Sequence, residues 1–342
     1  MTSTHPFVSV IVLNYNGLQH LQTVLTSLEK QTYPADKYEI VLADNGSSDE
    51  SITYTHQNHP RVRTMVFEKN FGFAEGNNIA ARKVSSEVLA FLNNDTEADP
   101  AWLEALVSAY GHDQNGIYGS QAYQFNKRHI GANSVAKLMA WGIPTNVNVY
   151  KSRETISSEI EETLYADAAG MLIGRNVFLA LGGFNPSYFA YEEEKDLGWK
   201  GWLLGHKSYV IPASIYFHKG GATLGKFSNR AIFLLWRNGL RNLIKYPTAM
   251  LLWPMLILHV GYSLSSLLLI FLPQKRVTLA WSIFKAYASI ITELPKLLRQ
   301  RKEIQRGRVV SDRDLQKRGL LLGPLGSLRL ALSFLQRRRS LS

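Results

Sequence analysis

The fold is indicated first by residues 8–17, which read VSVIVLNYNG. A run of β-branched and apolar residues ends there in Asn, Tyr and Gly, and such residues are typical of turns. A run of this kind is typical of a strand buried on both faces of a sheet. Apolar residues then recur at helical spacing from Leu18 to Leu28. The sequence therefore predicts a strand followed by a helix.

Three more strands are predicted before residue 100, at residues 38–43, 62–67 and 88–92, with a helix at residues 75–84. Strands separated by helices predict parallel βαβ units and an α/β sheet wound in both directions. We expect a Rossmann-like, mostly parallel sheet flanked by helices.

The pattern is less regular from residue 101 to 225, and residues 123–161 are polar without a clear period. Strands are predicted at residues 167–173, 208–211 and 214–217, a turn at residues 182–186 and a helix at residues 192–204. The acidic residues at the start of that helix favour the positive end of its dipole.

Charge divides the chain into two parts. Residues 1–225 hold 17 Lys and Arg against 23 Asp and Glu, a net charge of −6, whereas residues 226–342 hold 21 against 4, a net charge of +17. A basic, apolar tail suits an anionic lipid surface. Nucleic acid is disfavoured as a partner, because the basic residues alternate with aliphatic runs rather than with base-stacking aromatics. We expect a globular domain over residues 1–225 and a helical, membrane-associated region over residues 226–342.

Several classes of protein are excluded by what the sequence lacks. It has no cysteine, which rules out disulfides, zinc–thiolate sites and cysteine nucleophiles. No basic leader precedes the first predicted strand, so no signal peptide is expected. Neither a Gly-x-Gly-x-x-Gly motif after that strand nor a P-loop motif occurs, which argues against dinucleotide and P-loop sites.

The C-terminal region contains a stretch from Ala249 to Leu272 that is long enough to span a bilayer, which takes about 20 residues. Pro254 and His259 weaken that interpretation, as does Lys285 in a second apolar stretch at residues 277–294. A single span would also place the basic end outside, against the positive-inside tendency. We expect helices on the membrane surface or a two-segment hairpin. The alternatives are a buried helix pair and a homodimer interface.

Polar side chains follow two of the predicted strands, at the edge where open α/β sheets bind ligands. Asp95, in Asn93-Asn94-Asp95, is an oxygen ligand suited to Mg²⁺ or Mn²⁺, although the same three residues are good turn formers. Asp44 follows the second strand and could accept a hydrogen bond from the ring N–H of uracil or thymine. Its alternative role is an Asx-turn or a helix N-cap.

Two further groups of side chains could take part in catalysis or in metal binding. The carboxylates of Glu192 to Asp196 are close enough to raise one another's pKa, as suits a base that removes a proton from a hydroxyl. They could equally form the acidic first turn of an exposed helix. His218 follows a predicted strand and could bind a metal or a diphosphate, or could be structural.

Six segments, taken in order and spacing, resemble the family 2 inverting glycosyltransferases with a GT-A fold, above all their rhamnosyltransferase-like branch. The segments are VSVIVLNYNG, VLADNGSSDES, NFGFAEGNN, FLNNDTEADP, GGFNPSYFAYEEEKDLGWK and IPASIYFHKGGATL. The resemblance extends from residue 7 to about residue 245 and implies an enzyme that uses a nucleotide-activated sugar and Mg²⁺ or Mn²⁺.

The resemblance also implies a set of residues that bind the donor. They frame the pyrimidine nucleoside or lie near the ribose and diphosphate, and they are Leu13, Asn14, Tyr15, Asp44, Asn77, Asn78 and Asn93. Asn93 stands where the family's D-x-D motif has its first Asp, which leaves the metal one carboxylate fewer.

For the chemistry, the resemblance implies that Asp95 binds the metal and that His218 is a second contact to the metal or the diphosphate. Glu194 is the implied general base, and Glu193 and Asp196 are the alternative candidates for that role.

The family's processive synthases carry a Gln-x-x-Arg-Trp motif, and this chain has no Arg-Trp pair. We therefore expect one sugar to be added per acceptor. The implied donor is a UDP- or dTDP-sugar, of which dTDP-rhamnose is one. The implied acceptor is lipid-linked or an oligosaccharide in cell-surface polysaccharide synthesis, at the cytoplasmic face of the bacterial inner membrane.

Two functions other than glycosyl transfer are compatible with parts of the sequence. The first is a non-catalytic subunit that binds sugar nucleotides within a membrane assembly. The second is a sugar-phosphate nucleotidyltransferase, which is disfavoured because no Gly-rich phosphate loop follows Leu13.

Overall fold

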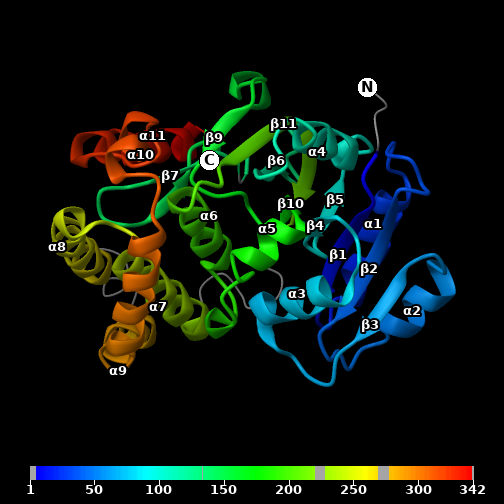
Figure 1. Cartoon of the computed structure of the whole chain (residues 1–342), viewed down its shortest axis with the longest axis horizontal. Helices are drawn as coiled ribbons and strands as arrows, with labels where there is room; N and C mark the ends of the chain where they lie inside the picture. Colours follow the sequence, from blue (N-terminus) through cyan, green and yellow to red (C-terminus); the bar gives the residue numbers. More distant parts are fainter. Residues whose placement is uncertain (1–4, 133, 220–227, 269–276, 341–342) are drawn as a thin grey trace.

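The structure is a computed structural model that describes residues 5–132, 134–219, 228–268 and 277–340 (Figure 1). The predicted domain boundary at residue 225 and the end of the apolar stretch, residues 269–272, lie outside the described residues.

The first part of the sheet is parallel. Its elements are β1 (Val8–Asn14), α1 (Leu18–Glu29), β2 (Tyr38–Asp44), α2 (Ser51–Asn58), β3 (Arg63–Val66), α3 (Gly72–Lys83) and β4 (Val88–Leu92). The strands lie in the order β3-β2-β1-β4, and each neighbouring pair is parallel. This confirms the predicted βαβ units. The order reverses beside β1, which is where open α/β sheets bind ligands.

The second part of the sheet is mixed. Its elements are β5 (Thr96–Ala98), α4 (Trp102–Tyr110), β6 (Ile117–Gln124), β9 (Glu161–Thr163), β10 (Gly170–Gly174) and β11 (Ser208–His218). Strand β10 is antiparallel to both β4 and β6, whereas β11 is parallel to β6. Among the nine strands of this sheet in the described residues, β1, β2, β3, β4, β6 and β11 run in one direction. The expectation of a mostly parallel sheet is therefore confirmed.

Two strand predictions in this part need correction. Residues 208–211 and 214–217 belong to one strand, β11, whose register shifts between Ile211 and Ile215. Pro212 lies in that interval and has no N–H with which to continue a regular ladder. The strand predicted from Asp167 begins instead at Gly170, because Asp167 forms a turn in which its Oδ1 accepts a hydrogen bond from Ala169 N at 2.9 Å.

The irregular segment before β10 contributes β7 (Ala136–Leu138), β8 (Pro144–Asn146) and a short 3-10 turn, η1 (Arg153–Thr155). After β10 follow α5 (Arg175–Ala180), a second 3-10 turn, η2 (Pro186–Tyr188), and α6 (Glu193–Leu203). Helix α6 is the predicted helix with acidic residues in its first turn.

Apolar packing covers both faces of the sheet. On one face, Val10 of β1 packs with Leu25 of α1 and Trp102 of α4. On the other, Ile11 of β1 packs with residues of α3, α5 and α6 such as Leu197. Burying each large aliphatic side chain contributes about 1.5–3 kcal/mol, so these two layers hold the strand ends in place.

The C-terminal helices lie to one side of the sheet, beside α6 and away from β1 to β3 (Figure 1). They are α7 (Asn229–Lys245), α8 (Ala249–Ser266), α9 (Val277–Gly307), α10 (Asp312–Lys317) and α11 (Pro324–Ser340). Their buried side chains Leu243, Tyr246 and Met255 share one apolar cluster with Trp199 and Trp202 of α6.

Within the described residues one helix, α8, has the length and apolar composition needed to cross a membrane, and 28% of that stretch is buried against the protein.

Candidate active site

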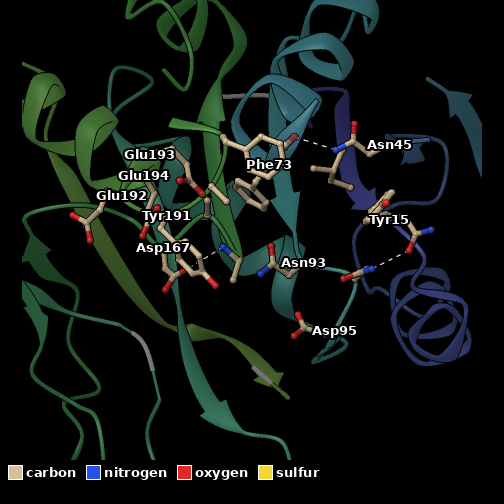
Figure 2. A pocket seen from close by; sticks show the side chains of 18 of the residues that line it. Tyr15, Asn45, Phe73, Asn93, Asp95, Asp167, Tyr191, Glu192, Glu193 and Glu194 are labelled. Atoms are coloured by element: carbon tan, nitrogen blue, oxygen red, sulfur yellow. Dashed lines mark hydrogen bonds between the residues drawn. The ribbon is translucent and has the colours of Figure 1, made fainter. Parts of the chain in front are cut away.

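A pocket of about 520 Å³ opens at the carboxyl ends of β1, β2 and β4. Tyr15 and Asn45 lie on one side of it, and the acidic residues at the start of α6 lie on the other (Figure 2). This is the edge of the sheet at which the sequence placed its polar clusters.

The wall formed by the strand ends contains four of the predicted donor-binding residues, Leu13, Asn14, Tyr15 and Asn93. Asn14 is buried and held by its neighbours: its Nδ2 donates to Asp44 Oδ1 at 3.2 Å, and its Oδ1 accepts from Asn94 Nδ2 at 2.9 Å. The ring of Tyr15 is 37% exposed and stands free at the rim, where an aromatic face can stack on a nucleobase.

The other predicted donor-binding residues do not line this pocket. Asp44 accepts from Asn14 and, at 3.0 Å, from the backbone N–H of Ser47, so it forms the Asx-turn that its sequence allows. Asn77 Nδ2 donates to Phe73 O at 3.0 Å, and Asn78 Nδ2 donates to Phe184 O at 2.7 Å. Their roles toward the donor stay predictions.

Asn45, one residue after Asp44, does line the pocket. Its Nδ2 donates to Gly72 O at 3.0 Å, and its Oδ1 accepts from Phe71 N at 3.0 Å, which fixes the start of α3 beside the pocket. The sequence signal for Asn45 was its place at the strand end, which it shares with Asp44.

Asp95, in the turn between β4 and β5, and His218, the last residue of β11, meet in the pocket although they are far apart in the sequence. His218 Nε2 lies 3.1 Å from Asp95 Oδ1. Burial acts to raise the pKa of Asp95, but the hydrogen bond and charge of His218 outweigh it and hold that pKa below its usual value. Asp95 is therefore ionised at neutral pH, as a metal ligand must be.

The opposite wall is acidic. Asp167, Glu192, Glu193 and Glu194 line it together, and Figure 2 shows them side by side. Among the described residues, neither Glu192 Oε2 nor Glu193 Oε2 has a hydrogen-bond partner, although both atoms are buried. A buried carboxylate oxygen without a partner is costly, so these atoms mark a site rather than a structural network.

The carboxyl group of Glu194 is suited to proton transfer near neutral pH. Burial, partly offset by Lys195 and reinforced by Asp167 and Glu192, raises its pKa to about 7. Burial together with the charge of Glu194 raises the pKa of Glu193 well above its usual value. A base works best when its pKa lies near the working pH, and Glu194 meets that condition.

Asp196, the other alternative candidate for the general base, does not line the pocket. Its carboxylate forms a buried ion pair with Lys245 of α7 and also accepts a hydrogen bond from Tyr188 OH at 3.0 Å. Burial acts to raise the pKa of Asp196, but the nearby Lys245 outweighs it and holds that pKa below its usual value. These contacts tie α6 to α7.

Replacing Asp196 by Asn is expected to destabilise the protein by about 3–5 kcal/mol, because it leaves the buried Lys245 without a counter-charge. Denaturant unfolding measures this loss, and the double variant Asp196→Asn/Lys245→Met should recover part of it. Turnover per folded molecule should stay near that of the wild type. Unchanged stability with lost turnover would instead return Asp196 to the chemistry.

Several pocket residues were not predicted, among them Phe73, Phe189 and Tyr191. The exposed Arg230 also lines it, from the first turn of α7, with its guanidinium 4.3 Å from the centre of the Phe189 ring. Phe73, Phe189 and Tyr191 fall inside the segments that carried the resemblance, so closer attention to their aromatic residues would have found them. Nothing near Arg230 in the sequence marks it.

Comparison with known proteins finds similarity to glycosyltransferases. Residues 9–167 match Glycosyl transferase family 2. Glycosyltransferase AglE of Haloferax volcanii is 36% identical over 111 residues, which cover 32% of this chain and 36% of AglE. The N-acetylglucosaminyl-diphospho-decaprenol L-rhamnosyltransferase of Mycobacterium tuberculosis is 25% identical over 250 residues, which cover 65% of this chain and 78% of that protein.

Among solved structures, GalNAc-T7 with UDP, GalNAc and Mn²⁺ is similar with a TM-score of 0.59 at 19% identity, covering 72% of this chain and 49% of that one. At 19% sequence identity, this similarity supports a shared fold and nothing further. The fold, the order of the motifs and the sequence matches agree that residues 9–167 form a glycosyl transferase family 2 domain with a GT-A fold.

Proposed function

We propose that the protein transfers one sugar residue from a UDP- or dTDP-sugar to a lipid-linked glycan, with inversion at the anomeric carbon. The observation that supports this proposal is that two chemically different walls face each other across one pocket. Aromatic and amide side chains at strand ends face a carboxylate cluster in which burial raises the pKa of Glu194 to about 7.

In the proposed reaction the acceptor hydroxyl oxygen bonds to the anomeric carbon as the bond from that carbon to the diphosphate oxygen breaks. Glu194 takes the hydroxyl proton, and the nucleoside diphosphate leaves. Because attack and departure occur on opposite sides of the sugar, the configuration inverts. Tyr15 and Asn93 would hold the nucleoside side of the donor, which leaves the sugar toward the acidic wall.

The residues present fit a divalent metal ion that binds together with the nucleotide-sugar donor. Asp95 and His218 offer one carboxylate and one imidazole side by side, and within the described residues no group of three or more His, Cys, Asp and Glu forms a complete cage. Mg²⁺ and Mn²⁺ sites in nucleotide enzymes commonly use one or two protein ligands together with substrate phosphates. A metal held there would neutralise charge on the departing diphosphate.

Support for the substrates comes from relatives. The mycobacterial relative is named for transfer of L-rhamnose to N-acetylglucosaminyl-diphospho-decaprenol, which favours dTDP-rhamnose as donor and a polyprenyl-diphosphate-linked sugar as acceptor here. Incubation of the full chain with UDP- and dTDP-sugars, Mn²⁺ and a prenyl-diphosphate-linked sugar tests this. A product of inverted anomeric configuration supports the proposal. Nucleotide binding without transfer or hydrolysis would favour a non-catalytic subunit.

We further propose that the C-terminal helices, taken as a separate region from residue 226, rest on the cytoplasmic face of the bacterial inner membrane. Helix α8 exposes Met250, Trp253 and Ile257 on one side, while its other side is tied to the protein. His259 Nδ1 lies 2.9 Å from Trp141 O. A helix held along one side in this way favours lying in the membrane plane. The net charge of +17 in residues 226–342 favours anionic lipid.

Trp253→Glu together with Ile257→Glu is expected to abolish flotation with phosphatidylglycerol-containing vesicles, since each buried large apolar side chain contributes about 1.5–3 kcal/mol. Carbonate extraction of wild-type membranes should release the protein. Retention after carbonate would support a spanning hairpin. If the wild type is a dimer that dissociates in the variant while flotation is unchanged, the exposed side of α8 is instead a homodimer interface.

A further inference from the structure

The segment that leads into the acidic wall is held in an unfavourable backbone conformation. We call residues 187–192 the acid loop. Phe189, Tyr191 and Glu192 have φ values of 66°, 68° and 73°, in the left-handed region that residues with a side chain avoid. Each such residue costs about 1–3 kcal/mol and persists only where the surroundings impose it. The chain passes from this loop directly into α6, which carries Glu194.

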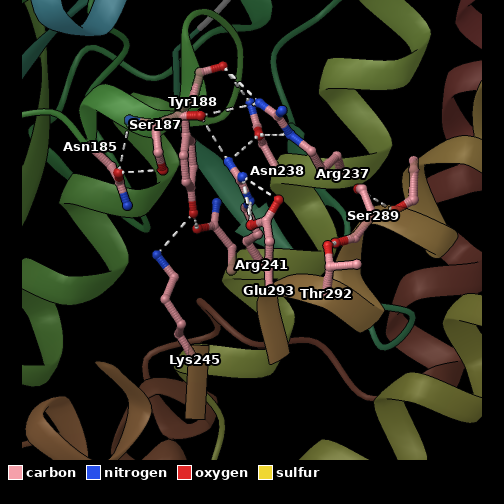
Figure 3. Close-up of polar contacts among 12 residues, drawn as sticks. Asn185, Ser187, Tyr188, Arg237, Asn238, Arg241, Lys245, Ser289, Thr292 and Glu293 are labelled. Atoms are coloured by element: carbon pink, nitrogen blue, oxygen red, sulfur yellow. Dashed lines mark hydrogen bonds and ion pairs between the residues drawn. The ribbon is translucent and has the colours of Figure 1, made fainter. Parts of the chain in front are cut away.

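The main hold on the acid loop is Asn238, a fully buried residue of α7. Its Nδ2 donates to Tyr188 O at 3.1 Å, to Ala190 O at 3.1 Å and to Tyr191 O at 2.8 Å. The two N–H groups of one amide thus serve three carbonyl groups of the loop. Figure 3 shows Asn238 together with Tyr188 and the two arginines Arg237 and Arg241.

The orientation of the Asn238 amide is set by two arginines. Arg237 Nε and Arg241 Nη1 each donate to Asn238 Oδ1 at 3.1 Å, so the oxygen faces the guanidinium groups and the NH₂ group must face the loop. Arg241 is in turn anchored to Glu293 of α9, donating from Nε at 2.8 Å and from Nη2 at 2.7 Å (Figure 3). Paired bonds of this kind fix a guanidinium in direction as well as in place.

The acid loop is also held from its other side. The carbonyl oxygen of Phe189 accepts hydrogen bonds from Phe73 N at 2.5 Å and from Ala74 N at 3.2 Å, in the first turn of α3. The loop therefore lies between a helix of the nucleotide-binding half and a helix of the C-terminal region. Helix α7 also bonds the two ends of the loop, since Arg241 Nη1 donates to Ser187 O at 3.0 Å and Asn242 Nδ2 donates to Glu192 O at 3.3 Å. Asn238 holds the middle of the loop, so its removal would let the left-handed residues there relax.

We propose that Asn238 is a positioning residue for sugar transfer, which keeps the acid loop in the conformation that directs Glu194 into the pocket, and that the Arg241–Glu293 pair keeps the Asn238 amide turned toward the loop. The proposal rests on the role of Glu194 proposed above. It extends the active site to α7 and, through Glu293, to α9, on which the apolar side chains Trp281 and Phe284 are exposed.

The test uses the full chain with Asn238→Ala. We expect kcat to fall about a hundredfold, because displacement of a catalytic group by about 1 Å has that effect, with KM for the donor and the number of nucleotide-binding sites per chain unchanged. Glu293→Gln, which weakens only the anchor of Arg241, should reduce kcat less. A spectroscopic check of folding accompanies each variant.

Gln31→Ala is the matched control. Gln31 is also a buried amide that makes three hydrogen bonds: its Nε2 donates to Ser27 O at 3.0 Å and Asp99 O at 2.9 Å, and its Oε1 accepts from Leu103 N at 2.9 Å. It lies outside the pocket lining, so this variant should lose stability but keep kcat per folded molecule.

Wild-type kcat in Asn238→Ala would overturn the positioning role alone. A fall in kcat that is matched by an equal fall in nucleotide-binding sites would also overturn it, since that pattern reports unfolding. Wild-type kcat in Glu194→Gln would instead overturn the proposed base.

Discussion

Replacing Glu194 by glutamine is expected to lower kcat about a thousandfold, within the range of about 10²–10⁴ that a positioned general base contributes. Glutamine keeps the size of the side chain but cannot accept the hydroxyl proton. Binding of the donor nucleotide should be unchanged, because the strand-end wall of the pocket is not altered. Release of nucleoside diphosphate and formation of product, measured under saturating donor, give the comparison.

The pH profile provides a second readout of the same residue. Glu194 must be ionised to act, and burial, moderated by Lys195 and increased by Asp167 and Glu192, raises its pKa to about 7. The wild-type kcat/KM, which reports the free enzyme, should therefore be low below pH 7 and rise to a plateau above it. Glu194→Gln should lack this rise.

Glu193→Gln is the control for Glu194→Gln, because it removes a neighbouring carboxylate of the same pocket wall. It should lower kcat much less. If the large loss follows Glu193 instead, then Glu193 is the base. Wild-type kcat in both variants would contradict a carboxylate base on α6.

Asp95→Ala is expected to abolish tight Mn²⁺ binding and to lower kcat at least about a hundredfold, since charge neutralisation at a leaving group is worth several kcal/mol. The low pKa of Asp95 keeps its carboxylate ionised beside His218. Without this carboxylate, the His218 imidazole would be the proposed metal ligand that is left in this pair. Calorimetric titration of Mn²⁺ in the presence of the nucleoside diphosphate measures the binding.

The matched variant for Asp95→Ala is Asn93→Asp, which adds a carboxylate two residues away on the same pocket wall. It should tighten Mn²⁺ binding, because a second carboxylate adds a hard anionic ligand. Mn²⁺ affinity that is unaffected by Asp95→Ala would exclude Asp95 as a ligand.

The parallel half of the sheet was predictable because β1, β2 and β4 are largely buried on both faces, and such strands form near-continuous apolar runs. The edge strand β3 is more exposed and shorter. The mixed half was harder to predict. Strand β11 looked like two strands because Pro212 interrupts its pattern. Within residues 123–161, β7 and β8 pair with each other over three residues each, and strands this short show too little alternation to be recognised in the sequence.

The candidate site was predicted best where position along a strand decides it. Leu13 to Tyr15 and Asn93 to Asp95 line the pocket as strand-end residues. The choice between Asp44 and Asn45 depended on which way each side chain points, and successive side chains point in opposite directions. Asp196 follows Glu194 by two residues on a helix, a rotation of about 200°, so the two carboxylates face different neighbours.

Asn238 could not have been found from the sequence. Its contacts with the acid loop join residues 47 to 50 positions apart, and it lies in the middle of α7 among apolar and basic residues that are ordinary for an amphipathic helix. What makes it important is the strained backbone it meets, and a backbone angle has no signature in residue type unless it is glycine.

The support of the acid loop from both α3 and α7 bears on how such enzymes diversify. If the sheet and the acid loop were joined to a different set of C-terminal helices, the acid loop would lose the Asn238 amide that holds it, even with every motif of the first 225 residues kept. The two halves of this chain therefore have to change together, and a tail exchanged by recombination must bring with it an equivalent of Asn238 and its arginines.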